Sequence, residues 1–315
     1  MAGAGSGLKL FNGLPAYLGG KRRLLKDIFA HVPPPREAPV FADAFLGGGS
    51  VSLFAKLRGH QVICNDAAER SHIVGKAIIE NSNRKLRWED ALLLFEKPTT
   101  PRDFVQKQFV PSVFMRRQAE WLDRAHARLL EVEVREGQSP RWWLLRYLVL
   151  NYMMRTAPFG TFSAKTTMEA LNTGDVELAN VVVVKDRESL RSAVSPPSAI
   201  RELVRLTNRC IVDNGRPCEA HRGDVVEFLR SVKADLVYFD PPYSGTTSYE
   251  QVYHPLDCVL AGAMVPLEKS RFSKDSNLKF LAEVFEAAVH IPLWVISYCN
   301  ADVELAELCD VVARH

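Results

Sequence analysis

The order of elements over the first 80 residues limits the fold more than any other feature of this chain. A short apolar strand over 40–45 leads into three glycines at 47–49, and a pattern typical of a helix follows. A second apolar strand over 61–64 ends at Asn65-Asp66, and residues 69–80 again have a helical pattern. A strand, a glycine loop, a helix and a strand that ends in an acid make up the first half of a doubly wound, nucleotide-binding α/β sheet.

The alternation of strands and helices stops near residue 82 and resumes near residue 217. In between, we predict helices over 107–134 and 141–154 and an irregular stretch over 161–186, with strand-like valines at 181–184. Afterwards the pattern predicts, in order, a strand at 218–221, a helix at 224–232, a strand at 235–239, a helix that begins after Ser276 and a buried strand at 293–296. The predicted fold is α/β: residues 1–81 and 217–315 form one sheet domain, and residues 82–216 form a mainly helical insert.

The composition is that of an ordinary soluble globular protein. Lys and Arg number 40 against 37 Asp and Glu, so the chain permits a polyanionic partner without requiring one. No apolar run reaches the roughly 18 residues of a membrane span, and the N-terminus lacks the apolar core of a signal peptide. The cysteines form no C-x-x-C pair, which predicts reduced thiols, no metal site and a cytoplasmic protein; they are Cys64, Cys210, Cys218, Cys258, Cys299 and Cys309.

Asp240-Pro241-Pro242-Tyr243 follow directly after the apolar run 235–239. The prolines fix φ, so the backbone leaves the predicted sheet stiffly and its carbonyls project outward. The Asp240 carboxylate and these carbonyls can accept hydrogen bonds from an exocyclic amine, and the Tyr243 ring offers a surface on which a planar base can stack. These groups suit methylation of an amino group on a nucleobase. A strand that ends in a proline-rich turn with a capping Asp would have the same sequence.

Three further features could belong to a cofactor site. Phe45, Gly47 and Gly49 form an F-x-G-x-G pattern, in which glycine lets backbone amides approach a ligand closely. Asp66 follows about 20 residues later, where an acid commonly hydrogen-bonds ribose hydroxyls. Asp224 could lie near the adenine amino group of a cofactor. Both acids could instead cap the helices that follow them.

With YLGGKRRLL at 17–25, the chain resembles the Dam-type class of DNA adenine-N6 methyltransferases. Members of this class carry G-G-K, F-x-G-x-G, an inserted target-recognition region and D-P-P-Y in this order. The resemblance covers most of the chain except the insert, and its matching runs are FADAFLGGGSVSLF (41–54), VICND (62–66), LVLN (148–151), ADLVYFDPPYSG (234–245), YEQVYH (249–254) and IPLWVIS (291–297).

The resemblance implies a Rossmann-like methyltransferase sheet that binds S-adenosylmethionine. It also implies methyl transfer to N6 of an adenine flipped out of double-stranded DNA. The catalytic residues would be Asp240, Pro241, Pro242 and Tyr243. The cofactor-binding residues would be Tyr17, Lys21, Phe45, Gly47, Gly49, Asp66, Asp224 and Asp240. A cognate restriction or defence system would be a second partner, and the protein would be associated with the nucleoid.

Three departures from the family pattern stand out. Ala44 occupies the position where many relatives have proline, which should change the stiffness of the loop. The segment after Asn151 does not reproduce the usual DNA-contacting run, so no recognition sequence is implied. The sequence stops at His315, shortly after the predicted strand at 293–296, and we expect the terminal β-hairpin of the family fold to be missing.

Arginines and aromatic residues are dense in the predicted insert. We predict that this segment faces DNA and that Arg116, Arg117 and Arg155 contact phosphates. In the alternative, the aromatic residues form the core of the insert and the arginines pair with nearby acids. The residues concerned are Arg116, Arg117, Arg124, Arg128, Arg135, Arg141, Arg146 and Arg155, with Trp121, Trp142, Trp143 and Tyr147.

Two other functions remain open from the sequence. D-P-P-Y-like motifs also serve methyltransferases that act on cytosine N4 or on RNA. A catalytically silent relative could keep the fold and bind DNA without turnover.

Overall fold

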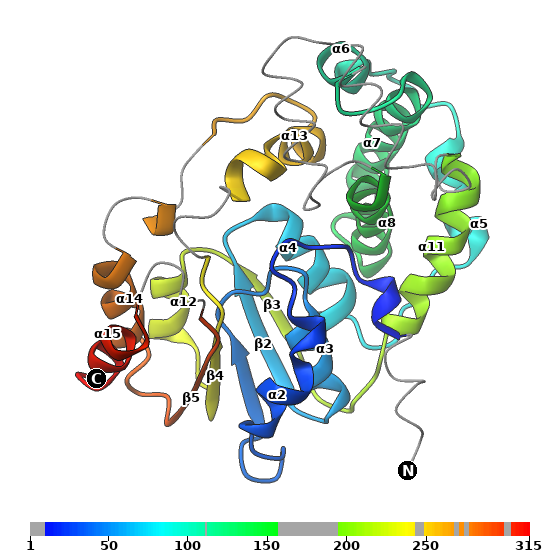
Figure 1. Ribbon diagram of the computed structural model, residues 1–315. Helices are drawn as coiled ribbons and strands as arrows, with labels where there is room; N and C mark the ends of the chain where they lie inside the picture. Colours follow the sequence, from blue (N-terminus) through cyan, green and yellow to red (C-terminus); the bar gives the residue numbers. More distant parts are fainter. Residues whose placement is uncertain are drawn as a thin grey trace. The chain divides into compact units, whose positions relative to one another are not determined.

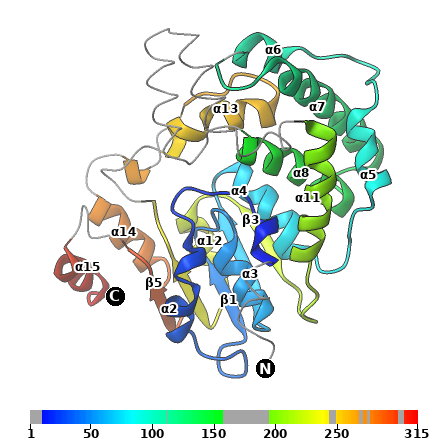
Figure 2. The same cartoon turned by 45° about the vertical axis from the view of Figure 1, so that its right-hand side comes forward.

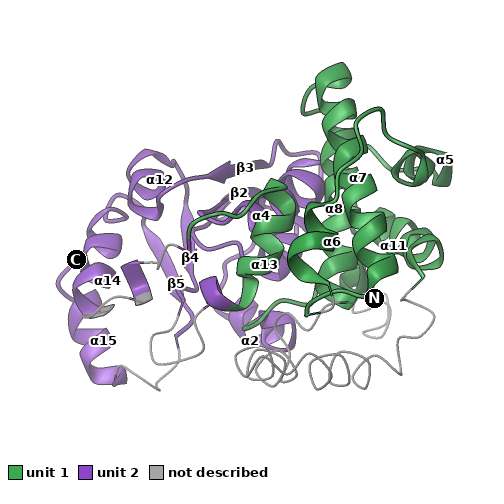
Figure 3. Cartoon of the chain, turned by 90° about the horizontal axis from the view of Figure 1, so that it is seen from above, with its two compact units in different colours: residues 1–19, 83–211, 252–266 green, residues 20–82, 212–251, 267–315 purple. Residues whose placement is uncertain are grey.

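The computed structural model describes residues 10–110, 112–156, 195–242, 249–267, 271–273, 277–298 and 304–315 (Figure 1). The chain divides into two compact units (Figure 3). The helical unit comprises residues 1–19, 83–211 and 252–266, and the sheet unit comprises residues 20–82, 212–251 and 267–315. Residues 1–19 and 252–266 therefore group with the helices, although we expected the target-recognition insert to span 82–216 only. The functional roles of the two units stay a prediction.

Five parallel strands form the sheet of the sheet unit, in the order β3-β2-β1-β4-β5 (Figure 1). Their bounds are β1 Val40–Asp43, β2 Gln61–Asp66, β3 Glu219–Arg222, β4 Leu236–Phe239 and β5 Leu293–Ile296. The strand order reverses between β1 and β4, and in sheets of this kind ligands bind outside the carboxyl ends of the strands at the reversal. The register places Asp43 beside Cys64 on β2 and Tyr238 on β4, so these carboxyl ends meet.

Helices pack on both faces of the sheet because alternate side chains of a strand point to opposite faces. On one face Phe41 of β1 packs against Phe29 of α2 (Leu25–Ala30), with ring centroids 5.9 Å apart. Phe29 in turn packs against Phe54 of α3 (Ser50–Leu57). The opposite face includes Val237 and Phe239, which share one core with α12 (Val225–Ser231), α14 (Asn277–Glu286) and α15 (Leu305–Val312). The prediction of a doubly wound α/β sheet is confirmed.

The helix predicted for residues 69–80 has two parts. It begins as α4 (Glu69–Val74) and continues as a turn of π-helix over Gly75–Glu80. Lys56, fully buried, donates hydrogen bonds from Nζ to the carbonyls of Ile79 (2.7 Å) and Asn81 (2.9 Å). These carbonyls lie at the end of the π-helix, where backbone acceptors lack partners within the helix, so the ammonium satisfies them.

The predicted burial of the strand at 293–296 is wrong. Leu293 is 41% exposed and the other residues of β5 are half-buried. Within the described part of the sheet, β5 lies at the edge and pairs with β4 alone. An apolar run predicts a strand but does not tell an edge strand from a central one.

The helical unit contains α5 (Trp88–Leu92), α6 (Phe104–Phe109), α7 (Arg116–Glu136), α8 (Pro140–Thr156), α11 (Pro196–Cys210) and most of α13 (Tyr249–Ala261). Helix α8 contacts both α7 and α11 (Figure 2). The helix predicted over 141–154 is confirmed, whereas the single helix predicted over 107–134 is divided between α6 and α7. Residues 161–186, Tyr243 and Ser276 lie outside the described residues.

The aromatic residues of α7 and α8 form the core of the helical unit. Trp121, Trp142, Trp143 and Tyr147 are all buried. The indole nitrogen of Trp142 donates a 3.0 Å hydrogen bond to the carbonyl of Leu129 on α7, which fixes the packing of the two helices. The core interpretation of these aromatic residues is therefore confirmed.

Candidate active site

Three carboxylates lie at the carboxyl ends of adjacent strands in the sheet unit. Asp43 is the last residue of β1, Asp66 is the last residue of β2, and Asp240 follows β4 directly. They surround the point at which the strand order reverses, which is the expected ligand site of a doubly wound sheet.

Asp240 forms an ion pair with Lys21. Lys21 Nζ lies 2.7 Å from Asp240 Oδ1, and the two side chains are only 10% and 17% exposed. Lys21 begins a short 3₁₀ turn, Lys21–Arg23, directly after Gly20 of the G-G-K segment. The sequence predicted both residues as site residues from segments more than 200 positions apart, and the fold brings their charged groups into contact.

The backbone directly before Asp240 is held by the sheet. Pro241 is buried and Pro242 half-buried, and Tyr243 lies outside the described residues. The amide of Ser297, just after β5, donates a 2.8 Å hydrogen bond to the carbonyl of Phe239. Asp240 therefore extends from a strand end whose neighbours on β4 and β5 are fixed.

The glycine loop is tied to Asp66. The Gly47 amide donates a 2.9 Å hydrogen bond to Asp66 Oδ2, and the Ala68 amide donates one of 2.9 Å to Asp66 Oδ1. Gly49 has a φ of 75°, and a Cβ there would lie 2.8 Å from Val74 Cγ1 on α4. Asp66 thus joins the loop to the start of α4, a role close to the predicted helix cap. Contact with ribose stays a prediction.

Phe45 lies at the start of the same loop. Its amide donates a 3.2 Å hydrogen bond to Asp43 Oδ1, and its ring packs edge-on against Phe272, with centroids 5.4 Å apart. The ring is thus held on the side of the sheet that α14 covers, because Phe272 belongs to the same core.

Asp224 caps α12. Its Oδ1 accepts hydrogen bonds from the amides of Val226 (2.9 Å) and Glu227 (3.3 Å). The side chain of Asn65 donates a 3.2 Å bond to the carbonyl of Gly223, which joins the end of β2 to the turn before the cap. The capping interpretation of Asp224 is confirmed, and its predicted contact with a cofactor remains untested.

Asp43 is a site residue that the sequence prediction missed. Its side chain is buried, and Oδ2 accepts a 2.6 Å hydrogen bond from the Ser52 hydroxyl on α3. Burial raises the pKa of Asp43 to about 7, although the hydrogen bonds from Ser52 and the Phe45 amide lower it and the charges of Asp240 and Asp66 raise it further. The sequence feature that could have revealed Asp43 is its position as an acid at the end of the first strand, directly before the glycine loop.

Tyr17 belongs to the helical unit, and Lys21 belongs to the sheet unit. The Tyr17 ring stacks on Tyr253 of α13 at a centroid distance of 5.2 Å. The Tyr253 hydroxyl accepts a 2.9 Å hydrogen bond from the Leu18 amide. These contacts order the segment before the G-G-K motif, and the predicted contact of Tyr17 with a cofactor is untested.

The three predicted DNA-contacting arginines have different surroundings within the helical unit. Arg116 and Arg117 are exposed at the first turn of α7. Arg155 instead donates hydrogen bonds to Asn151 Oδ1 (2.8 Å) and to the carbonyls of Leu14 (3.2 Å) and Asn12. Burial lowers the pKa of Arg155. These bonds give Arg155 a structural role, because they join α8 to the segment at residues 12–14. Within the described part of the chain, Arg116 and Arg117 have no such role.

Several other arginines of the helical unit are engaged in ion pairs. Arg128 pairs with Glu96 and Glu131, and Arg141 pairs with Asp90 and Glu136. The ion-pair interpretation is therefore confirmed for these two arginines.

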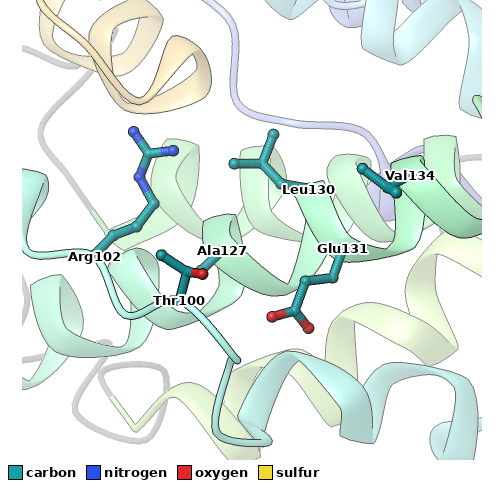
Figure 4. Close-up of a pocket in the computed structure, with 6 residues that line it drawn as sticks. All are labelled: Thr100, Arg102, Ala127, Leu130, Glu131 and Val134. Carbon is teal, nitrogen blue, oxygen red and sulfur yellow. The ribbon is translucent and has the colours of Figure 1, made fainter.

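A hollow of about 460 Å³ lies on the surface of α7, between this helix and the segment around Thr100 (Figure 4). Its lining is largely apolar, and Val134 there is 91% exposed. The two charged side chains that line it are already bonded: Glu131 accepts from the Thr99 amide, and Arg102 donates to the carbonyl of Gly262. This hollow lacks the convergent polar groups of the strand-end site.

The strand-end site and the parallel sheet define a Rossmann-like methyltransferase fold, and comparisons with known proteins specify the family. The family model of the D12 class N6 adenine-specific DNA methyltransferases matches residues 17–173. The chain is 27% identical over 296 residues to the type II methyltransferase M2.HphI of Haemophilus parahaemolyticus, covering 90% of this chain and 82% of that protein. It is 24% identical over 259 residues to the modification methylase StsI of Streptococcus sanguinis, covering 77% of this chain and 36% of that protein.

The chain belongs to the D12 class of N6 adenine-specific DNA methyltransferases. The predictions of the family and of adenine-N6 methylation of DNA are thereby confirmed. The matched stretch includes the glycine loop and Asp66 but ends before Asp240. The role of Asp240 must therefore be argued from the residues around it in the structure, and not from the family match.

Two further observations apply to the described part of the chain. None of its helices is long and apolar enough to cross a membrane. Its His, Cys, Asp and Glu side chains form no group that could hold a metal ion.

Proposed function

We propose that this chain transfers a methyl group from S-adenosylmethionine to N6 of an adenine in duplex DNA, with Asp240 as the residue that accepts hydrogen bonds from the target amine. The observation that carries the proposal is the Lys21–Asp240 ion pair, which lies at the strand-end site with the glycine loop and Asp66. Membership of the D12 class supports the reaction, and the position of Asp240 supports its assignment as the catalytic carboxylate.

The residues of the strand-end site fit the cofactor. Gly47 and Gly49 have positive φ angles, which glycine adopts without strain, so the loop can turn tightly at the carboxyl ends of β1 and β2 and present its backbone there. Asp66 lies at the end of β2, where a carboxylate can accept hydrogen bonds from ribose hydroxyls. When bound, S-adenosylmethionine supplies an electrophilic methyl group on a positively charged sulfur.

Asp240 would act by accepting a hydrogen bond from the adenine amino group, with the Pro241 carbonyl as second acceptor. Hydrogen bonds in this arrangement favour a tetrahedral nitrogen and localise its lone pair, which makes the amine a nucleophile. Tyr243, assigned from the sequence, would stack on the base. The amine loses one proton overall when it gains the methyl group.

Lys21 would keep the Asp240 carboxylate oriented. Two side chains that are 10% and 17% exposed are largely shielded from water, and a charge in such a place needs a partner. The Lys21 ammonium balances the negative charge of Asp240 and contacts one of its carboxylate oxygens, Oδ1.

We further propose that Arg116 and Arg117 contact phosphates of duplex DNA and that the enzyme acts with a cognate restriction system. The exposure of both side chains at the start of α7 supports the first proposal. The names of the two relatives, a type II methyltransferase and a modification methylase, support the second.

Methyl transfer by matched variants tests the assignment of Asp240. Purified wild-type protein, Asp240→Asn and Asp310→Asn are incubated with duplex DNA and tritiated S-adenosylmethionine. Asp310 lies exposed on α15 in the same unit and serves as the control. We expect Asp240→Asn to lose about 10²–10⁴-fold in rate while the control stays active. Near-wild-type activity of Asp240→Asn with an unchanged melting temperature would overturn the assignment.

A further inference from the structure

Asp43 is a buried acid whose position the methyl-transfer proposal does not use. It is the last residue of β1, between the ends of β2 and β4, and its side chain is 1% exposed. Both oxygens accept hydrogen bonds from neutral donors, the Phe45 amide and the Ser52 hydroxyl. An acid buried among neutral donors is costly to ionise, so its presence at this point needs a reason.

The groups that face Asp43 come from each neighbouring element. From β2 come the Asp66 carboxylate and the Cys64 thiol, from the end of β4 comes Asp240, and from α3 comes Ser52. Lys21 pairs with Asp240. Two further carboxylates therefore influence Asp43, and a cation that binds at this edge would relieve the repulsion among them.

We propose that Asp43 determines specificity for the charge of the cofactor: its carboxylate is a buried counter-charge that favours the sulfonium methyl donor over the neutral thioether that remains after transfer. The reaction converts a sulfonium and an amine into a thioether, a methylamine and a proton, so the sulfur loses its positive charge. An enzyme that favours the charged form binds the donor and releases the product. The inference rests on the proposed function, because it takes the ligand of this edge to be a sulfonium.

Binding is then linked to proton release. Near pH 7 the Asp43 carboxyl is divided between its two protonation states. A bound cation favours the ionised state, so the complex holds fewer protons than the free protein and the affinity for the donor rises with pH. The rise occurs below about pH 7 and levels off above it. The thioether lacks the charge, so its affinity should change less.

Calorimetry of the full-length protein without DNA tests this linkage. S-adenosylmethionine and S-adenosylhomocysteine are titrated at pH 6.0, 6.5 and 7.0, in pairs of buffers that differ in ionisation enthalpy. This range lies below that in which an α-amino group of either ligand loses its proton. If the sulfonium improves ionisation of Asp43 about tenfold, the ratio of donor to product affinity should rise about threefold from pH 6 to 7. About half a proton should be released with the donor at pH 6.5.

Two variants should change the pH dependence of the affinity ratio in different ways. Asp43→Asn keeps the size and the acceptor for the Phe45 amide, and should make the affinity ratio independent of pH. Ser52→Ala removes the hydrogen bond that favours the ionised carboxylate, so the rise in the ratio should move to higher pH. Circular dichroism and thermal unfolding confirm that each variant is folded.

The outcomes separate this inference from the proposed function. If the wild-type protein binds neither ligand, the assignment of the cofactor fails and the inference fails with it. If it binds both and the ratio does not change with pH, the role of Asp43 is overturned and the assignment of the cofactor stands. Equal loss of affinity for both ligands in Asp43→Asn, with no change in the ratio, would also overturn it and leave Asp43 as a loop support.

Discussion

Because Asp43 is a buried acid, we predict that its replacement by asparagine changes the pH dependence of the free energy of unfolding. Burial raises the pKa of this carboxyl from 3.8 to about 7 in the folded protein. Between these two values the folded state binds the proton more tightly than the unfolded state. The free energy of unfolding therefore falls as the pH rises from about 4 to about 7, and is lowest above pH 7. Asparagine has no charge to desolvate, so the free energy of unfolding of Asp43→Asn should not fall in this way as the pH rises.

The size of the effect follows from the shift. A rise of about three pKa units corresponds to about 4 kcal/mol when the group is fully ionised, at about 1.4 kcal/mol per unit. Part of this loss is already present at pH 5, because the unfolded carboxyl is mostly ionised there. The difference between pH 5 and pH 8 is therefore about 2–3 kcal/mol. Asp43 is 1% exposed, so solvent screening reduces the value little.

Urea denaturation of the protein without ligand measures this difference. The free energies of unfolding of wild type and Asp43→Asn are compared at pH 5 and at pH 8, with the exposed Asp310→Asn as control. From pH 5 to pH 8, the free energy of unfolding of Asp43→Asn should rise by about 2–3 kcal/mol relative to that of wild type. For the control, the free energy of unfolding relative to wild type should change by less than about 0.5 kcal/mol. A constant offset between wild type and Asp43→Asn at both pH values would refute the reasoning.

The remaining predictions concern the cofactor, the ion pair and DNA. Asp66→Ala should weaken S-adenosylmethionine binding by about 1.5–3 kcal/mol in calorimetry, since a charge-assisted bond is lost; unaltered affinity would leave Asp66 as a support of the loop. Lys21→Met should reduce methyl transfer by about 10–100-fold because Asp240 loses its ion-pair partner, and Lys21→Arg should restore part of the rate; equal rates for both variants would contradict this role. Neutralising Arg116 and Arg117 to Gln should lower the slope of log K against log[salt] for duplex DNA by about 0.9 per lost contact, whereas an unchanged slope would move the DNA-facing surface elsewhere.

Much of the sheet could be predicted because its signals are local. The apolar strand before Asp240 and the glycine loop before α3 each occupy a few consecutive residues. Parallel strands place the loops after β1 and β4 at one edge, whereas Lys21 was assigned to the site only through the family resemblance, without knowledge of its 2.7 Å contact with Asp240. Asp43 escaped prediction because its significance depends on burial and on Ser52, nine residues later, which a linear pattern does not reveal.

The helical unit was harder to predict. Val110 precedes a proline in the sequence, and this position disfavours helical φ and ψ, which explains the break between α6 and α7. Helix α11 begins with Pro196 and Pro197, which are compatible with the first helical turn but resemble a loop in the sequence. The role expected of Arg155 could not be separated from packing, because its partners Asn12 and Leu14 are about 140 residues away.

The central claim is that this chain methylates N6 of adenine in DNA by means of Asp240. Long-read sequencing of DNA from a methylation-free host that expresses the wild-type chain or Asp240→Asn tests it most directly, because one experiment identifies both the modified base and its sequence context. We expect N6-methyladenine at one recurring motif with the wild-type chain and unmodified DNA with the variant. N4-methylcytosine in the wild-type sample, or N6-methyladenine at the same level in the Asp240→Asn sample, would contradict the account.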